Sequence, residues 1–258
     1  MKEGAGETRM KLLDLLKKKQ KAYDDSHNFT CDVCGREVFG GERICAPCQK
    51  ELPWNDQIVC PFCGRRVREP GVCIECKQRP LGVIKARSVF VHEGEAARLI
   101  VRFKRGEKYL FRTLAELALP LVQSEFEFID AVIGVPMTER AVKKRGYNQA
   151  HLLAEQIAEL SEKQVLAPVK KQRETDSQKF LSRREREKNL DGCFHVEKRS
   201  AVKGKRILIV DDTLTTGATV SALADALSRA GALQIYALTI TGVENKFPFG
   251  KPPQQKKK

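Results

Sequence analysis

The sequence is poor in several residue types, with one tryptophan, three methionines and four histidines, and aromatic residues make up 7% of its 258 positions. So few aromatic side chains predict cores built mainly from aliphatic residues. No apolar run approaches the length of about 18 residues that a membrane-spanning helix needs. The polar start of the chain also lacks the apolar stretch of a secretory signal. We therefore expect no membrane span and a cytoplasmic location.

Cysteine is more frequent, with nine copies. In a reducing compartment, paired cysteines usually bind metal or carry out redox chemistry rather than form disulfides. The segment from 31 to 76 repeats itself, since Cys31-Asp-Val-Cys34-Gly-Arg recurs as Cys60-Pro-Phe-Cys63-Gly-Arg. It contains four Cys-x-x-Cys pairs, which are Cys31/Cys34, Cys45/Cys48, Cys60/Cys63 and Cys73/Cys76.

Two Cys-x-x-Cys turns together make a tetrahedral site of four thiolates, so the eight cysteines predict two structural zinc ions. An iron–sulfur cluster is the main alternative. Sequential pairing closes the shorter loops and is preferred, but a crossed pairing stays open. Gly35 and Gly64 follow the first pair of each repeat, where a tight turn favours positive φ. The lone Cys193 is expected to be a small buried residue.

The cysteine module has either a purely structural role or a binding role. Aromatic and basic side chains within it offer a stacking surface for nucleic acid, namely Trp54, Phe62, Arg65, Arg66 and Arg68. The net charge of the whole chain is +14, and most of the excess lies after residue 130. Such a charge favours polyanions, although a solvated basic surface explains it equally well.

The chain after the cysteines alternates predicted helices and strands. Apolar residues at helical spacing predict helices over 94–105, 110–123, 149–160 and 218–230, the last closed by Gly231, and buried runs predict strands over 129–135, 206–210 and 235–240. Residues 137–147 are predicted as a basic loop, and the charged segment 170–192 as a mobile loop or short exposed helix. The pattern predicts an α/β domain with a parallel sheet.

Four domains are predicted along the chain. A polar arm, with a basic amphipathic helix over 8–22, occupies 1–28, and the cysteine module occupies 29–80. The α/β domain spans 81–244. The tail at 245–258, rich in proline and lysine, is predicted to be disordered.

Ligands of parallel sheets bind at the carboxyl ends of the strands, which here means the loop 211–217. The adjacent carboxylates of Asp211 and Asp212 repel each other unless a ligand binds them, and ribose hydroxyls can donate hydrogen bonds to both. Threonines and Gly217 then lead into a helix N-terminus, which favours phosphate. Helix capping explains one or two of these residues, but not the whole set. We therefore predict a sugar-phosphate site.

The stretch Val210-Asp-Asp-Thr-Leu-Thr-Thr-Gly-Ala-Thr219 closely resembles the phosphoribosyl-pyrophosphate motif of type I phosphoribosyltransferases. Further segments resemble ComF-family (ComFC-like) proteins, namely Gly134-Val-Pro-Met-Thr-Glu-Arg140, Lys144-Arg-Gly-Tyr-Asn-Gln149, Gln178, Leu181-Ser-Arg-Arg-Glu-Arg186, Asn189, Gly192 and Phe194. The double zinc ribbon is also that family's arrangement. The resemblance implies a type I phosphoribosyltransferase-like parallel sheet with helices on both faces.

The resemblance also implies roles for individual residues. Asp211 and Asp212, the candidate catalytic pair, hold the ribose hydroxyls, and Mg²⁺ arrives with phosphoribosyl pyrophosphate. The loop after β-strand 129–135 faces the pyrophosphate, and segment 171–190 closes over the site. Ligand-binding candidates are Thr213, Thr215, Thr216, Gly217, Ala218, Thr219, Arg140, Lys144 and Arg145, and closing-loop candidates are Gln178, Arg184 and Arg186.

Thr215 stands where 6-oxopurine phosphoribosyltransferases have a carboxylate that helps to deprotonate the base, which argues against hypoxanthine or guanine as acceptor. Members of the family are associated with DNA uptake in bacterial natural transformation. The resemblance therefore favours a phosphoribosyl-pyrophosphate-binding protein of DNA uptake, with single-stranded DNA and other uptake proteins as partners. Two alternatives stay open: a phosphoribosyltransferase with another acceptor, and a phosphoribosyl-pyrophosphate sensor whose ribbons bind nucleic acid or protein.

Overall fold

The computed structural model describes residues 30–39, 41–173 and 192–244. The chain forms two compact units, residues 1–52 and residues 53–258, so the boundary falls between the two cysteine groups. The predicted arm at 1–28 and tail at 245–258 lie outside the described residues, as do Gln178, Arg184 and Arg186. The domain boundaries predicted from the sequence stay predictions.

The described part of the first unit is small. Its helix α2 (Ala46–Glu51) begins after Cys45, which is the N-cap, and has a proline in its first turn. Proline suits this position because the first N–H groups of a helix have no intrahelical partner. A short antiparallel bridge joins Thr30 to Glu37 and closes the turn that carries Cys31 and Cys34.

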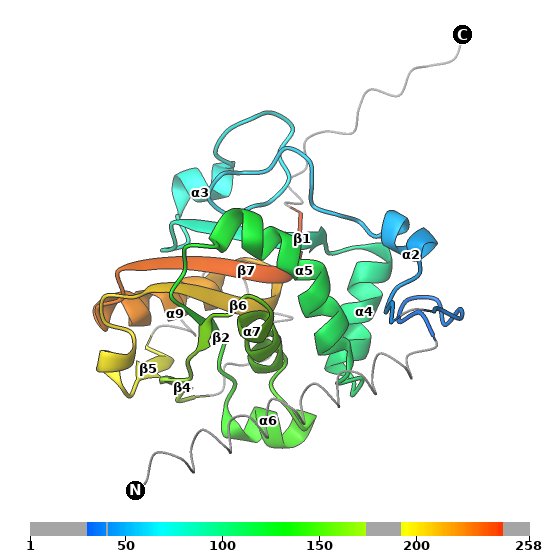
Figure 1. The fold of residues 1–258 in the computed structure, drawn as a ribbon. Helices are drawn as coiled ribbons and strands as arrows, with labels where there is room; N and C mark the ends of the chain where they lie inside the picture. The colour runs from blue at the N-terminus through cyan, green and yellow to red at the C-terminus, as the bar shows by residue number, and fades with distance from the viewer. Residues whose placement is uncertain (1–29, 40, 174–191, 245–258) are drawn as a thin grey trace, which may run out of the picture. The chain divides into compact units, whose positions relative to one another are not determined.

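The second unit contains a five-stranded parallel sheet (Figure 1). In spatial order its strands are β1 (Lys85–Val91), β7 (Gln234–Gly242), β6 (Arg206–Leu214), β2 (Ala131–Gly134) and β3 (Gln164–Val165). A separate antiparallel pair is formed by β4 (Val169–Lys171) and β5 (Phe194–Val196). Because residues 207–210 of β6 are all fully buried, both faces of this central strand must be covered.

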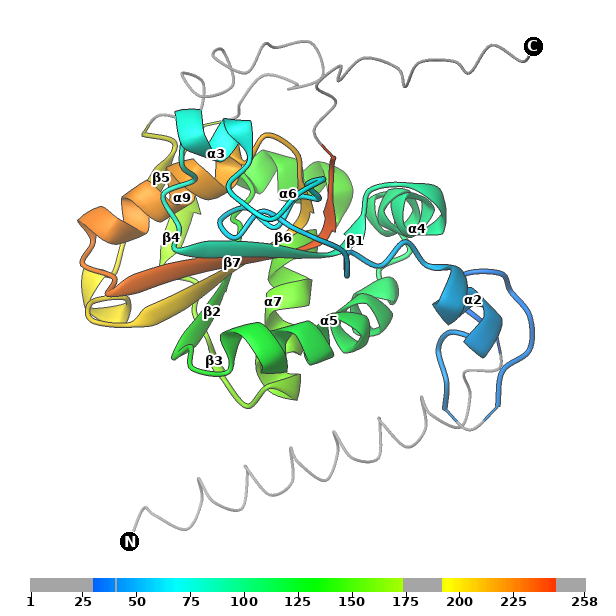
Figure 2. The same ribbon diagram turned by 90° about the horizontal axis from the view of Figure 1, so that it is seen from above.

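Helices supply that cover. α5 (Leu110–Phe126) and α7 (Gln149–Leu160) lie on one face of the sheet, and α9 (Ala218–Arg229) lies on the other (Figure 2). The described residues also form four shorter elements, namely α3 (Ile74–Gln78), α4 (Gly94–Lys104), α6 (Glu139–Arg145) and a 3-10 helix (Arg199–Ala201). The expected parallel sheet with helices on both faces is thus confirmed.

The core on the α9 side joins the sheet to the second cysteine group. Ile207 and Ile209 of β6 pack in one buried cluster with Leu223 and Leu227 of α9. The same cluster contains Cys60, Cys63, Cys73 and Cys76, which are at most 8% exposed. The second cysteine group is therefore part of the hydrophobic core of the α/β domain.

Most elements match their predictions closely. The helix predicted over about 149–160 corresponds to α7. The helix predicted over 218–230 corresponds to α9, which ends one residue earlier at Arg229 and is followed by Gly231 at φ 94°. The predicted strands at 129–135 and 235–240 correspond to β2 and β7. Cys193 is fully buried, as expected of a small apolar side chain.

Three predictions were wrong in detail. The basic loop predicted at 137–147 contains α6, which Thr138 caps with its hydroxyl and which ends at the left-handed Gly146. Strand β6 continues to Leu214 instead of ending at Val210, because β7 pairs with it as far as Gly242. Lys170 and Lys171, predicted as loop or exposed helix, form the end of β4, where the buried Val169 pairs with Val196.

Candidate functional site

The carboxylate pair lies on the last part of β6, at the C-terminal end of the strand, where ligands of parallel sheets bind. Asp211 pairs with Thr239 in the register of β6 and β7, and Thr213 pairs with Thr241. The predicted loop is therefore shorter and consists of Thr215 to Gly217 between β6 and α9. The strand geometry holds the two carboxylates more rigidly than a loop would.

The two carboxylates have different surroundings. Asp212 is 9% exposed, and its Oδ1 lies 2.7 Å from Lys104 Nζ. Asp211 Oδ1 accepts a hydrogen bond of 2.8 Å from the backbone N–H of Asp212. Burial, together with the neighbouring Asp212 carboxylate, raises the pKa of Asp211 to about 7. One carboxylate is thus neutralised by a lysine, while the other holds its proton more tightly than an ordinary aspartate.

Gly217 is the N-cap of α9 and has φ 83°, a left-handed conformation that favours glycine. A Cβ at this position would lie 2.3 Å from Cδ2 of Leu81. The hydroxyl of Thr216 accepts a hydrogen bond of 3.3 Å from Ala218 N, whereas Gly217 has no side chain with which to cap the helix. Capping therefore accounts for Thr216 alone, and the other threonines at this helix start need a different explanation.

Lys104 was not predicted as a site residue. It is the last residue of α4, and its ammonium group also lies 3.5 Å from the hydroxyl of Thr213. No local pattern marks it, because its partners are more than 100 positions away in the sequence. Its charge lies at the carboxylate pair, where the sequence predicts a sugar-phosphate site.

His92 and Thr241 extend the polar surroundings of β6. His92 Nδ1 lies 2.9 Å from Thr241 Oγ1, which in turn lies 3.2 Å from Thr213 Oγ1. The pKa of His92 is lowered, first by burial and then by the nearby charge of Lys104. A neutral histidine at this position can accept or donate a hydrogen bond without adding charge to the site.

The pyrophosphate candidates Arg140, Lys144 and Arg145 are exposed on α6. Helix α6 follows β2, whose Gly134 pairs with Val210 directly before the carboxylates. The sheet thus brings the start of this segment to the edge that carries the carboxylates. Arg145 Nη1 donates to Gln149 Oε1 at 2.9 Å, and contact of the three cations with a ligand stays a prediction.

The Arg-Gly-Tyr-Asn-Gln element connects several parts of the domain. The buried Tyr147 donates its hydroxyl hydrogen bond to the carbonyl of Phe103, next to Lys104. The side chain of Asn148 caps α7 by accepting from His151 N, and its amide donates to Val135 O at 3.0 Å. This element therefore joins the end of β2, the start of α7 and the end of α4.

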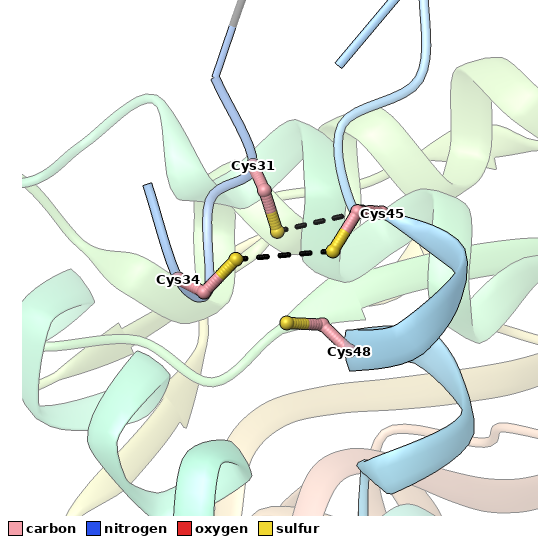
Figure 3. A group of neighbouring side chains, drawn as sticks. All are labelled: Cys31, Cys34, Cys45 and Cys48. Atoms are coloured by element: carbon pink, nitrogen blue, oxygen red, sulfur yellow. Dashed lines mark hydrogen bonds between the residues drawn. The ribbon is translucent and has the colours of Figure 1, made fainter. Parts of the chain in front are cut away.

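The eight clustered cysteines form two groups of four, in sequential order, and within each group the sulfur atoms lie within 4.8 Å of one another. In the first group, Cys34 Sγ and Cys45 Sγ are 3.8 Å apart (Figure 3). In the second, Cys63 Sγ and Cys73 Sγ are 3.6 Å apart. Four thiolates at about 2.3 Å from a zinc ion are about 3.8 Å from one another, so both groups fit a single tetrahedral ion. Such spacing leaves no room for the bridged irons of a cluster.

The backbone favours thiolates in both groups. Cys45 N donates to Cys31 Sγ, and Cys73 N donates to Cys60 Sγ, each at 3.4 Å. Although burial acts in the opposite direction, backbone hydrogen bonds lower the pKa values of Cys31 and Cys60 to about 7. Gly35 and Gly64 have φ values of 71° and 67°, which confirms the predicted positive φ.

The predicted stacking and basic surface of the cysteine module is only partly available. Arg65 is 4% exposed and forms an ion pair with Glu75, so it cannot bind nucleic acid from that position. Trp54 packs on Phe90, with ring centroids 4.7 Å apart, and its carbonyl accepts from Arg66 Nη2 at 2.6 Å. Two members of the set remain exposed, Phe62 and Arg68.

Within residues 30–39, 41–173 and 192–244, no helix is both long enough and apolar enough to cross a membrane.

Comparisons with known proteins agree with this architecture. Residues 28–77 match the double zinc ribbon domain, and residues 114–246 match the phosphoribosyl transferase domain. A solved structure of a glutamine phosphoribosylpyrophosphate amidotransferase from B. subtilis is 24% identical and covers 53% of this chain and 26% of its own. Its TM-score of 0.34 is too low to carry an argument.

Whole-length relatives are more similar. The DNA utilization protein YhgH of Salmonella typhi is 31% identical and covers 84% of this chain and 92% of its own. Competence protein ComFC of Bacillus subtilis is 27% identical, and the match covers 79% of this chain and 86% of the relative. Competence protein F of Haemophilus influenzae is 28% identical, and the match covers 81% of this chain and 94% of the relative. A double zinc ribbon followed by a phosphoribosyltransferase domain, shared with these relatives along most of the chain, shows that the protein belongs to the ComF family.

Proposed function

We propose that this protein binds phosphoribosyl pyrophosphate with Mg²⁺ at the carboxyl edge of its sheet and acts in the uptake or use of DNA. The observation that carries the ligand assignment is the position of Asp211 and Asp212 on β6, six and five residues before Gly217 at the N-terminus of α9. Carboxylates suit ribose hydroxyls, and a helix N-terminus suits the 5-phosphate. The DNA role rests on the names of the relatives.

The residues around the carboxylates fit an anionic sugar ligand. Lys104 adds a positive charge within 2.7 Å of Asp212, and exchange of this contact for ligand phosphate would leave the carboxylate available to the ribose. Mg²⁺ is bound mostly by ligand oxygens and water, and it would neutralise pyrophosphate charge. Arg140, Lys144 and Arg145 on α6 are proposed to face the pyrophosphate, and Thr215 to Thr219 to hold the 5-phosphate.

Turnover needs an acceptor in addition to ligand binding. Thr215 is exposed and carries a hydroxyl where a 6-oxopurine enzyme has a carboxylate, so it cannot serve as the base for a purine acceptor at neutral pH. We therefore propose that any transfer uses a different acceptor. A site that only senses phosphoribosyl pyrophosphate is the alternative.

The two cysteine groups are proposed to hold one structural zinc ion each. Their donor set of four sulfurs at tetrahedral spacing is the one that structural zinc sites use. Few apolar side chains are buried around the first group, so its metal supplies much of the folding free energy of that unit. Metal analysis of freshly purified protein should return two equivalents of zinc, and iron in place of zinc would contradict the assignment.

Calorimetry with magnesium and phosphoribosyl pyrophosphate tests the ligand assignment. Asp211→Asn with Asp212→Asn replaces both carboxyl groups with amides of nearly the same shape. A hydrogen bond to a charged group is worth about 1.5–3 kcal/mol, so affinity should fall at least about tenfold. Equal affinity of the double variant and the wild type would show that the ribose binds elsewhere. Pyrophosphate release with candidate acceptors then separates transfer from sensing.

A further inference from the structure

Arg65 follows the first cysteine pair of the second ribbon and is held firmly in place. Its carbonyl accepts a hydrogen bond of 2.8 Å from Cys60 N. The preceding Gly64 packs so closely against β1 that a Cβ there would lie 2.6 Å from Ala86 O. The Arg65 side chain is therefore fixed at its base by the turn around the metal ligands.

The guanidinium group of Arg65 makes two contacts with different parts of the domain. Nη1 pairs with the carboxylate of Glu75, which lies in α3 beside Cys76. Nη2 donates a hydrogen bond to the backbone carbonyl of Thr215, in the loop that precedes α9. One buried cation thus connects the second metal-binding segment with the candidate phosphate-binding loop.

The first ribbon supplies an internal comparison. The repeat places Arg36 after Cys34 and Gly35, as it places Arg65 after Cys63 and Gly64. Both turns have the same backbone hydrogen bonds, since Cys31 N donates to Arg36 O and Cys60 N donates to Arg65 O. Arg36 is nevertheless exposed, whereas Arg65 is buried. The turn itself therefore does not require a buried arginine.

Holding the Thr215 carbonyl also orients the next N–H group. In a trans peptide unit, C=O and N–H point in opposite directions. When Arg65 holds the Thr215 oxygen toward the ribbon, the N–H of Thr216 points away from the ribbon. Leu81 restrains the same loop from another direction, because it fills the space that a side chain at Gly217 would need.

We propose that Arg65 is a positioning residue for the 5-phosphate of phosphoribosyl pyrophosphate. By connecting the second zinc ribbon to the Thr215 carbonyl, Arg65 orders the loop that binds this phosphate. This inference rests on the proposed function for its ligand, but the ordering of the loop can be measured without ligand. The second ribbon then orders the loop that binds the phosphate.

The test compares Arg65→Gln with the matched control Arg36→Gln in the full chain. Three quantities are measured: zinc per chain, amide hydrogen exchange of peptides covering 213–219 without ligand, and the Kd for magnesium and phosphoribosyl pyrophosphate. Arg65→Gln should keep two zinc ions and speed exchange in the 213–219 peptides. It should weaken binding about tenfold, because the ligand must then order the loop itself. Arg36→Gln should change none of the three.

Unchanged exchange and unchanged affinity in Arg65→Gln would overturn the proposal, and so would equal effects of the two substitutions. If the wild type does not bind the ligand, but exchange in 213–219 still rises in Arg65→Gln alone, the assignment of the 5-phosphate fails, whereas the ordering of the loop by Arg65 stands. If Arg65→Gln loses zinc, the variant Glu75→Gln tests the ordering of the loop in its place. This variant keeps the guanidinium and all eight cysteines, and faster exchange in 213–219 with two zinc ions retained supports the proposal, whereas unchanged exchange overturns it.

Discussion

Gly217→Ala gives the sharpest test of the geometry around the candidate phosphate-binding loop. The left-handed φ of 83° costs a residue with a Cβ about 1–2 kcal/mol. The new Cβ would lie 2.3 Å from Leu81 Cδ2, and Leu81 is itself only 6% exposed, so it has little room to move. Overpacking of this kind costs about 1–3 kcal/mol, which gives a total loss of about 2–5 kcal/mol.

Gly204→Ala is the matched control, because Gly204 has φ 73° but nothing within 4 Å of an added Cβ. It should lose only the conformational part, about 1–2 kcal/mol. Thermal denaturation followed by circular dichroism measures both, and each kcal/mol lowers the Tm of a domain of this size by about 2–4 °C. Gly217→Ala should also weaken ligand binding, whereas Gly204→Ala should not. If both variants lose the same stability, contact with Leu81 does not restrict the size of the side chain at position 217.

Three further predictions concern the metal groups, the carboxylate pair and the exposed ribbon surface. Cys31→Ser should unfold the first unit only. Cys60→Ser should lower the melting temperature of the second unit, because Cys60 is fully buried in the core of that unit. Calorimetry in which Cys31→Ser shifts the transition of the second unit would contradict this prediction. Asp211→Asn should raise the melting temperature more at pH 8 than at pH 5. The folded-state pKa of Asp211 is raised to about 7 by burial and by Asp212, so the stability it contributes when protonated is lost as pH rises from about 4 through 7. If Asp211→Asn melts below the wild type at pH 8, the raised pKa of Asp211 is refuted. Single-stranded DNA should bind with an affinity that falls steeply between low and moderate salt. Phe62→Ala and Arg68→Ala together should weaken this binding more than Arg98→Ala, the control, which removes an equal charge from α4. Equal effects of the variants in a fluorescence anisotropy titration would exclude the ribbon as the binding surface.

Local patterns in the sequence were sufficient for most of the fold. α7 was predicted closely because its buried positions recur at helical spacing and Asn148 caps its start. α6 was missed because none of its seven residues is buried, so it has no apolar periodicity. The hydroxyl of Thr138 and the left-handed Gly146 were the signals that could have revealed it.

The site was harder to predict where it depends on contacts between distant parts of the chain. The carboxylates and the glycine before α9 follow one another in the sequence, so they could be found together. Strand β6 was expected to end at Val210, and only its pairing with Thr239 and Thr241 shows why it continues. Lys104 and Arg65 reach the site from distant elements, and the sequence placed Arg65 in a candidate basic surface instead.

The hydrogen bonds of Tyr147 and Asn148 bear on how relatives of this protein should be recognised. Both side chains join secondary-structure elements to one another through backbone carbonyls and N–H groups. Selection on folding alone would preserve them, even in a lineage that had lost the Asp-Asp pair and every use for a ribose. The tyrosine–asparagine element is therefore a marker of common descent, whereas retention of Asp211 and Asp212 is the marker of the proposed ribose site.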